Sequence, residues 1–536
     1  MKNIGLKTLI NSILILIIVT ILCVILNFIS KIFFIETLFE IPSLFYQYKN
    51  SIKLTFILNT SVILLTVILG FLISIYFFVN KKDTILKYFI PYPHISFAIG
   101  ILFFFSTSGL LNRFLNFYNK SEIPLIGYMS NNEYSILYII SLTMRELPFF
   151  ILVSIMILNK INFLFLQKHS ENLKLKKFNF YLSVIFPLWI KRMLLPILII
   201  ISFSYSNYEY SFILGTQFPE LLNQELVNIW KNEFHYNTHN YNVLSLFITI
   251  CFIFTYLFIY LIFQINRYLS IHNVYRKLNI NLILIGKYLY LFLIFIFVSN
   301  FIILLINSLS TNWFFPNIIP SGFTINNFLE IFDNNLNLII NSIIISIFLS
   351  ILSIVIFLTY FQLKIKLTSN YLEYVLFISV LLILIIPQNI FLINLNIIFN
   401  YLPIDSELFF YLFSLIIFIF PYTYFMLKEK FSSELYKSLY LQKENLKLSN
   451  YKFLRNIIYP IYKDTIIFIT LIGFSVCYYQ FLQSIFIGSG NQRLFNNEVM
   501  VLFSGESAQL SSAAAIINLL PCLVLFKYFK FNNVKV

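Results

Sequence analysis

Charged side chains are scarce in this sequence. Asp, Glu, Lys and Arg together make up 11% of its 536 residues, whereas hydrophobic residues make up 59%. A soluble protein of this length does not need so much apolar surface, because its exterior must stay hydrated. The composition therefore excludes a soluble enzyme or binding domain and indicates a chain solvated largely by lipid.

Glycine is also scarce, with 12 residues, and no glycine-rich loop ends in Lys-Ser or Lys-Thr. A P-loop nucleotide-binding domain needs such a loop to hold phosphates, so the chain contains none. No constellation of catalytic residue types stands out either. We therefore expect a protein that is not itself an enzyme and that carries no cofactor.

Metal-binding residues are few. The four cysteines lie in apolar segments, and their spacing fits neither a zinc site nor a disulfide framework. His235 and His239 stand four residues apart in a polar loop, which is a possible metal-binding spacing. A solvated loop is the favoured interpretation of this pair, so no metal site is expected.

What the sequence does contain is a series of apolar runs of about 20 residues, the length of a membrane-spanning helix. A bilayer offers no partners for unpaired backbone groups, so such runs must be helical. The first run lacks a small-residue cleavage site and is interpreted as a retained helix. We predict an all-α, polytopic membrane protein with about twelve transmembrane helices. The expected spans are 8–30, 54–79, 88–106, 134–158, 187–213, 243–265, 288–309, 338–361, 373–398, 408–427, 461–486 and 510–528.

The loops between these runs alternate in charge. One set is rich in Lys and Arg, as at 174–177 and 443–452, and the other is poor in them and carries most of the Glu and Asp. The positive-inside rule places the basic loops and both termini in the cytoplasm. The net charge of +15 follows largely from this bias and is divided among short loops, so no nucleic-acid partner is expected.

A polar segment occurs twice. Residues 171–187 read ENLKLKKFNFYLSVIFP, and residues 444–460, which begin 273 positions later, read ENLKLSNYKFLRNIIYP. The same spacing relates Pro148 to Pro421 and Gly215 to Gly488, so the register holds over roughly 70 residues. We predict two parallel six-span repeats, 1–266 and 288–536, joined by a basic cytoplasmic link at 267–287.

Each repeated segment ends a basic loop between the fourth and fifth spans of its half, at about 160–187 and 428–460. The plan resembles the EAA loop of binding-protein-dependent ABC importer permeases. In that family Glu-Ala-Ala, then Gly, then Leu-Pro mark a coupling helix that docks on the ATPase. Counted back from Pro187 and Pro460, Lys174 and Lys447 occupy the Gly position. Leu173 and Leu446 also fit the family's pattern. Glu171 and Glu444 supply an acidic residue three positions later than the Glu of that pattern.

Three further segments resemble fused, two-domain permeases of the thiamine, ferric-iron and related solute group. They are 145–150 (RELPFF), 211–215 (SFILG) and 312–316 (NWFFP). The resemblance implies a MetI-like permease in a bacterial inner membrane. It implies two separate cytoplasmic ATP-binding subunits and a periplasmic solute-binding protein as partners. The transported solute stays open.

Three of the charged residues in predicted spans are candidate site residues. Arg145 and Glu146 lie about halfway along the fourth span, where unpaired charge is costly. Their counterparts 273 positions on are Phe418 and Ile419. These residues mark a translocation path or gate, or else form an internal ion pair or helix–helix bond. Glu209, near the outer end of the fifth span, is a candidate substrate contact or an interface carboxylate.

The sequence leaves two other classes open. One is a secondary transporter with parallel six-span halves, as in the major-facilitator group. Its usual basic motif between spans two and three is missing here, where the link is Asn80 to Asp83. The other is a membrane scaffold that transports nothing.

Overall fold

The structure is a computed structural model. The residues it describes are 18–30, 35–80, 85–119, 135–173, 175–233, 238–271, 280–364, 370–404, 406–431, 433–505 and 507–528. Among them, ten helices are long and apolar enough to cross a membrane, and eleven if one sharply bent pair counts as a single span. The described part of the chain contains helices and no strand. The protein is thus an all-α, multi-pass membrane protein.

The predicted number of twelve spans is higher than the structure gives for its described residues. Of the predicted first span, 8–30, only the short helix Ile18–Ser30 is described, and 8–17 lie outside the described residues. Thirteen residues of α-helix reach about 20 Å, less than the hydrocarbon core of a bilayer, which is about 30 Å thick.

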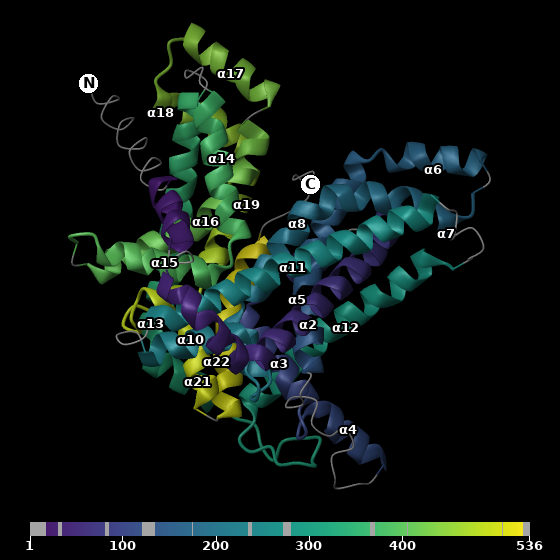
Figure 1. Cartoon of the computed structure of the whole chain (residues 1–536), viewed down its shortest axis with the longest axis vertical. Helices are drawn as coiled ribbons and strands as arrows, with labels where there is room; N and C mark the ends of the chain where they lie inside the picture. The colour runs from purple at the N-terminus through teal and green to yellow at the C-terminus, as the bar shows by residue number, and fades with distance from the viewer. Residues whose placement is uncertain are drawn as a thin grey trace. The chain divides into compact units, whose positions relative to one another are not determined.

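The first half of the chain is built from a succession of helices (Figure 1). They are α2 (Ile35–Asn80), α3 (His94–Phe105), α4 (Leu110–Asn119), α5 (Ile136–Lys160), α6 (Phe163–Asn172), α7 (Lys177–Asn179), the π-helical segment η2 (Phe180–Ile185), α8 (Phe186–Ser206), α9 (Tyr208–Leu214), α10 (Leu222–Glu233) and α11 (Thr238–Ile271).

The second half has α12 (Leu282–Leu309), α13 (Asn326–Lys364), α14 (Asn370–Ile385), α15 (Gln388–Asn400), α16 (Glu407–Phe431), α17 (Glu434–Asn445), α18 (Asn450–Phe453), the π-helical segment η4 (Leu454–Ile458), α19 (Tyr459–Tyr478), α20 (Leu482–Phe486), α21 (Phe495–Ser504) and α22 (Ala508–Tyr528).

Helix boundaries in the two halves recur at the spacing of the sequence repeat. The loop helices α6 and α17 end at Asn172 and Asn445, and α8 and α19 begin at Phe186 and Tyr459. Each pair of positions is 273 residues apart. A π-helical segment precedes the long helix in both halves, and a short helix after a break follows it.

Three predicted spans are interrupted, which corrects their sequence-based boundaries. The predicted span 373–398 bends by 116° between α14 and α15, because Pro387 has no N–H to continue the helix and disfavours helical backbone at the residue before it. The predicted spans 187–213 and 461–486 stop at Ser206 and Tyr478. At the first break, Asn207 takes extended backbone and its side chain caps the new helix by accepting from Tyr210 N–H.

The chain forms two compact units. The first unit comprises Phe34–Ile331 with Leu502–Ile517, and the second comprises Phe332–Val501 with Met1–Phe33 and Asn518–Val536. The first apolar helix of each predicted half therefore groups with the body of the other half. In the second unit, Asn27 donates to Asn394 Oδ1 at 3.1 Å. The predicted division at 266 and 288 concerns the sequence repeat and stays a prediction.

Close packing and buried polar bonds hold the first unit. Gly286 of α12 lies so near α2 that a Cβ on it would come within 2.3 Å of the Leu72 carbonyl oxygen. Trp189 Nε1 donates to Ser154 Oγ, and Ser154 Oγ donates to Ser74 Oγ, both at 2.7 Å. Small residues and hydroxyl groups of this kind join helices inside a membrane, where apolar burial alone adds little.

A hydroxyl group of a long helix accepts a hydrogen bond from the first residue of α10 and, likewise, of α21. Thr55 Oγ1 of α2 accepts from Leu222 N–H at 3.0 Å in the first unit. Ser342 Oγ of α13 accepts from Phe495 N–H at 2.8 Å in the second. A helix N-terminus leaves its first N–H groups without partners in the helix, so each long helix satisfies one such group of its own unit.

Candidate functional site

The two loops that carry the repeated segment end their helices with the same backbone bonds. In the second loop, Leu446 N–H donates to Gln442 O at 2.9 Å, and Leu448 N–H donates to Lys443 O at 3.1 Å. In the first loop, Leu173 N–H donates to His169 O at 3.1 Å, and Leu175 N–H donates to Ser170 O at 3.0 Å. Donors and acceptors all correspond at the spacing of the sequence repeat.

Lys447 has the left-handed backbone that closes the second loop helix. Its φ is 49°, and its N–H donates to Glu444 O at 3.1 Å. Together with the Leu448 bond, this is a Schellman cap, in which glycine is the usual residue at the left-handed position. The position matched to the family's glycine thus has the backbone that favours glycine. Lys174, its counterpart in the first loop, lies outside the described residues.

Aromatic side chains anchor the loop helices to the segments that follow them. Tyr436 and Tyr440 of α17 are buried, and the Tyr440 ring lies 6.0 Å from that of Phe453. Lys443 is also buried, with Nζ 4.6 Å from the centre of the Tyr440 ring. In the first loop, buried Phe163 of α6 lies 5.8 Å from the ring of Phe180. These contacts hold α6 and α17 against the segments η2 and α18, which precede the long helices α8 and α19.

The loop helices also expose apolar side chains. Leu173 and Leu446 are 73% and 66% exposed at matching positions. Phe165 of α6 and Leu441 of α17 add further exposed apolar surface at 62% and 60%. Exposed apolar side chains gathered on an otherwise polar loop are typical of a surface that binds another protein.

The remaining predicted loop residues flank this surface. Glu171 is exposed, and its Oε1 accepts from Gln167 Nε2 at 3.1 Å. Glu444 is exposed as well. Pro187 and Pro460 stand in the first turns of α8 and α19, directly after the π-helical segments η2 and η4.

A second group of predicted residues is buried in the first unit. The Arg145 side chain of α5 is 7% exposed and donates through Nη2 to Ile90 O at 3.1 Å. The same Nη2 lies 3.5 Å from His94 Nε2. The Arg145 guanidinium is within 4.0 Å of no carboxylate of the described residues, so Arg145 makes a bond to the turn before α3 rather than an ion pair with Glu146.

Several polar atoms of this group have no hydrogen-bond partner within the described part of the chain. They are Arg145 Nε, Glu146 Oε1 and His94 Nδ1, and all are buried. Buried polar atoms are almost always paired in native proteins, so a cluster of unpaired ones needs an explanation. Glu209, in α9, is partly exposed and precedes Tyr210, whose ring lies 6.2 Å from that of His94. The fold therefore brings Arg145, Glu146 and His94 together with Tyr210.

Sequence reasoning missed two residues described above, His94 of the buried group and Lys443 of the second loop. His94 carries no motif, and its place beside Arg145 depends on how α3 packs against α5. Lys443 looked like one more lysine in a basic loop, and no local pattern distinguishes a buried lysine from exposed ones. Tyr440 and Phe453 could have given a signal, since a lysine between aromatic residues can stack on them.

The helices α10 and α21 differ in charge at matched positions. Glu220 and Glu225 in the first unit correspond to Arg493 and Glu498 in the second. Arg493 Nη1 and Glu498 Oε2 form an ion pair at 3.1 Å. Burial, together with the charge of Glu220, raises the pKa of Glu225 to about 7, because the charged form is poorly solvated and faces a like charge.

No family model, curated protein or solved structure matches this chain.

Proposed function

We propose that this chain is the transmembrane permease subunit of an ABC importer. It forms the solute pathway across a bacterial inner membrane, with both termini in the cytoplasm. A periplasmic binding protein delivers the solute, and two cytoplasmic ATP-binding subunits drive transport. The observation that carries the proposal is the pair of matching loops.

The loops suit this role because they present the same feature twice. Each has a short helix with the same terminal bonds, an aromatic anchor on the inner side and an exposed leucine at the matching position. Two equivalent docking elements on one chain fit two copies of one ATPase. The aromatic anchors would transmit movement of the docked helix to α8 and α19, which gives rigid-body coupling between ATP-driven closure and the pathway.

The exchange of first helices between the units also supports a duplicated permease. A helix of the second half completes the first unit and a helix of the first half completes the second unit. Such a reciprocal arrangement follows when two like chains that embrace each other are fused into one.

Within this proposal, Arg145 and Glu146 belong to the pathway or its gate in the first unit. Buried charge inside a membrane protein normally faces a partner or a water-filled path. Arg145 has only neutral partners among the described residues. A solute group or a second conformation would supply the missing contacts.

The test is capture of ATPase subunits by the purified chain. Exchange of both exposed leucines, Leu173→Asp with Leu446→Asp, should abolish recovery of the ATPase, because each site would bury a charge in place of an apolar side chain. The paired variant Leu173→Met with Leu446→Met keeps apolar surface and should retain two ATPase copies per chain. Mass determination of the complex from the native host is the measurement.

Two outcomes would contradict the proposal. One is a wild-type chain that purifies alone and takes up solute with an ion gradient as the only energy source, which is the behaviour of a secondary transporter. The other is an Asp variant that elutes as a folded protein and still holds both ATPases. A change of the acids alone, Glu171→Lys with Glu444→Lys, tests whether charge adds to the docking contact.

A further inference from the structure

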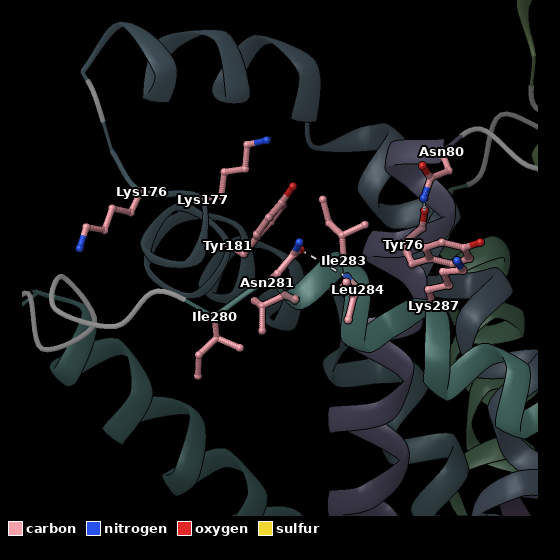
Figure 2. A pocket seen from close by; sticks show the side chains of 11 residues that line it. Tyr76, Asn80, Lys176, Lys177, Tyr181, Ile280, Asn281, Ile283, Leu284 and Lys287 are labelled. Atoms are coloured by element: carbon pink, nitrogen blue, oxygen red, sulfur yellow. Dashed lines mark hydrogen bonds between the residues drawn. The ribbon is translucent and has the colours of Figure 1, made fainter.

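A cavity of about 730 Å³ lies beside the first loop (Figure 2). Its walls come from three parts of the first unit. They are the end of α2, the start of the segment α7–η2, and the start of α12. The lining residues are Tyr76, Asn80, Lys176, Lys177, Tyr181, Ile280, Asn281, Leu282, Ile283, Leu284 and Lys287.

The charge of this cavity is one-sided. Lys176, Lys177 and Lys287 line it, and its lining includes no Asp or Glu. In Figure 2, Tyr181 extends toward the start of α12, Lys177 extends toward the loop helix above the cavity, Lys287 stands beside Tyr76, and Lys176 points outward at the rim. Lysines on two walls of one cavity favour an anion between them.

The start of α12 adds to this preference. Asn281 caps the helix by accepting from Leu284 N–H at 3.3 Å. The helix that begins there is 28 residues long, and the N-terminus of a helix carries partial positive charge. Phosphate groups bind well where such a terminus and lysine side chains meet.

The position and size of the cavity suit an amphipathic ligand. It lies where α2 ends and α12 begins, and both helices are candidate membrane spans. Cavities of about 300–1,000 Å³ accommodate ligands larger than a single phosphate group. Ile280, Ile283 and Leu284 provide an apolar part of the wall next to the lysines.

We propose that this cavity binds a phosphate group, carried either by an anionic phospholipid headgroup or by a soluble phosphate compound. Basic segments at a membrane surface attract anionic lipids, so both sources share the chemistry of the site. If the chain is the permease proposed above, the bound phosphate ties the first loop to α12. Loading of the site then sets how readily that loop moves with its ATPase.

At the positions that match the first loop, the second unit lacks these lysines. Lys176, Lys177 and Tyr181 correspond to Ser449, Asn450 and Leu454. A smaller cavity of about 380 Å³ does include Leu454, but apolar residues dominate its walls and Arg455 is its one charged residue. Phosphate binding thus controls the movement of the first loop and not that of the second.

The test measures ligand binding to the purified chain alone, without ATPase subunits. Native mass spectrometry counts bound dioctanoyl-phosphatidylglycerol against dioctanoyl-phosphatidylcholine, with inorganic phosphate as a competitor. The variant Lys176→Gln/Lys177→Gln/Lys287→Gln should bind phosphatidylglycerol about a hundredfold more weakly. The single change Lys287→Gln should weaken it about fivefold.

A control removes three exposed lysines elsewhere and should leave binding unchanged: Lys191→Gln, Lys452→Gln and Lys463→Gln. Displacement of the lipid by inorganic phosphate would identify the soluble source, and resistance to it would identify the headgroup. Equal binding of phosphatidylcholine, or unchanged binding in the triple variant, would overturn the proposal. Because no ATPase is present, that failure would leave the importer proposal untouched.

Discussion

The two units share their backbone plan but differ in charge. The loop helices end with the same hydrogen bonds, and the long helices that follow begin at matching residues. Yet Arg145 and Glu146 of the first unit have apolar counterparts, Phe418 and Ile419, in the second. Under the proposed function, docking would be a duplicated task, whereas Arg145 and Glu146 would serve a task of the first unit alone.

The helices α10 and α21 show the same contrast at smaller scale. The second unit pairs Arg493 with Glu498 at 3.1 Å. The first unit has two glutamates at these positions. A like-charge pair lowers the stability of the folded state, whereas an ion pair of the same geometry does not. The first unit therefore contains a destabilising pair that the second unit lacks.

The largest expected effect comes from giving the first unit the residues of the second. In the double variant Arg145→Phe/Glu146→Ile, both buried charges leave together, so no single charge is stranded and the helices should stay packed. ATP-dependent uptake in reconstituted vesicles should fall at least about tenfold, because intramembrane charges usually serve a pathway.

The single variant Arg145→Ala separates structure from transport. It leaves the Ile90 carbonyl oxygen without its donor and should lower stability by about 2 kcal/mol. Thermal unfolding in detergent is the measurement. Full uptake by a well-folded double variant would show that these charges have no part in the pathway.

A smaller effect is expected on the pH dependence of stability. The pKa of Glu225 is about 7 in the folded protein, against about 4.3 in an unfolded chain. The folded state therefore holds this proton more tightly. The stabilisation contributed by the protonated Glu225 carboxyl group is complete below about pH 4.3 and is lost as the pH rises through 7. Solvent screening at this half-buried site limits the change to about 1 kcal/mol.

The variant Glu220→Arg should reduce that pH dependence, because it replaces a like charge with an arginine, as in the second unit, while the burial of Glu225 stays. The melting temperature at pH 8 should rise toward the value at pH 5. The reverse exchange, Arg493→Glu, should impose a new pH dependence on the second unit. An unchanged difference between pH 5 and pH 8 in Glu220→Arg would show that Glu225 does not sense the residue at 220.

The smallest effect concerns the cap of the second loop. Lys447→Gly relieves the left-handed backbone at φ 49° and should stabilise the end of α17 by about 0.5–1 kcal/mol. Slower hydrogen exchange at the Leu446 and Leu448 amides would report it. Ser438→Gly, at an exposed position inside α17, should do the opposite by about 0.5 kcal/mol. Faster exchange in both variants would remove the argument for a glycine-type cap.

Much of this architecture can be predicted from the sequence, because a segment that crosses lipid must be apolar and helical. Apolar length predicts the helices, and the repeated segment predicts loops of one plan. Pro387 could have predicted the bend that divides 373–398, since proline seldom continues a helix. Asn207 and the break at Ser206 were harder to foresee, because the apolar run continues through them.

The side-chain assemblies were not predictable in the same way. Arg145 stands out by its charge, but its neighbour His94 comes from another helix. Lys287 joins Lys177 across the cavity from a segment more than a hundred residues away. Such meetings depend on which helices pack together, and apolar patterns in lipid say little about that choice.

The start of the last helix, α22, belongs to the first unit, and this has a consequence for how the protein is synthesised. Ser96 Oγ in α3 donates to Ala515 O at 2.9 Å, and Ala513 to Ala515 are fully buried. The first unit to emerge from the ribosome must therefore wait for almost the last residues to be synthesised before its core can close. Domains usually mature in order during translation, but here synthesis of the second unit must nearly finish before the first is complete. A ribosome that stalls late would leave two unfinished units rather than one finished and one missing.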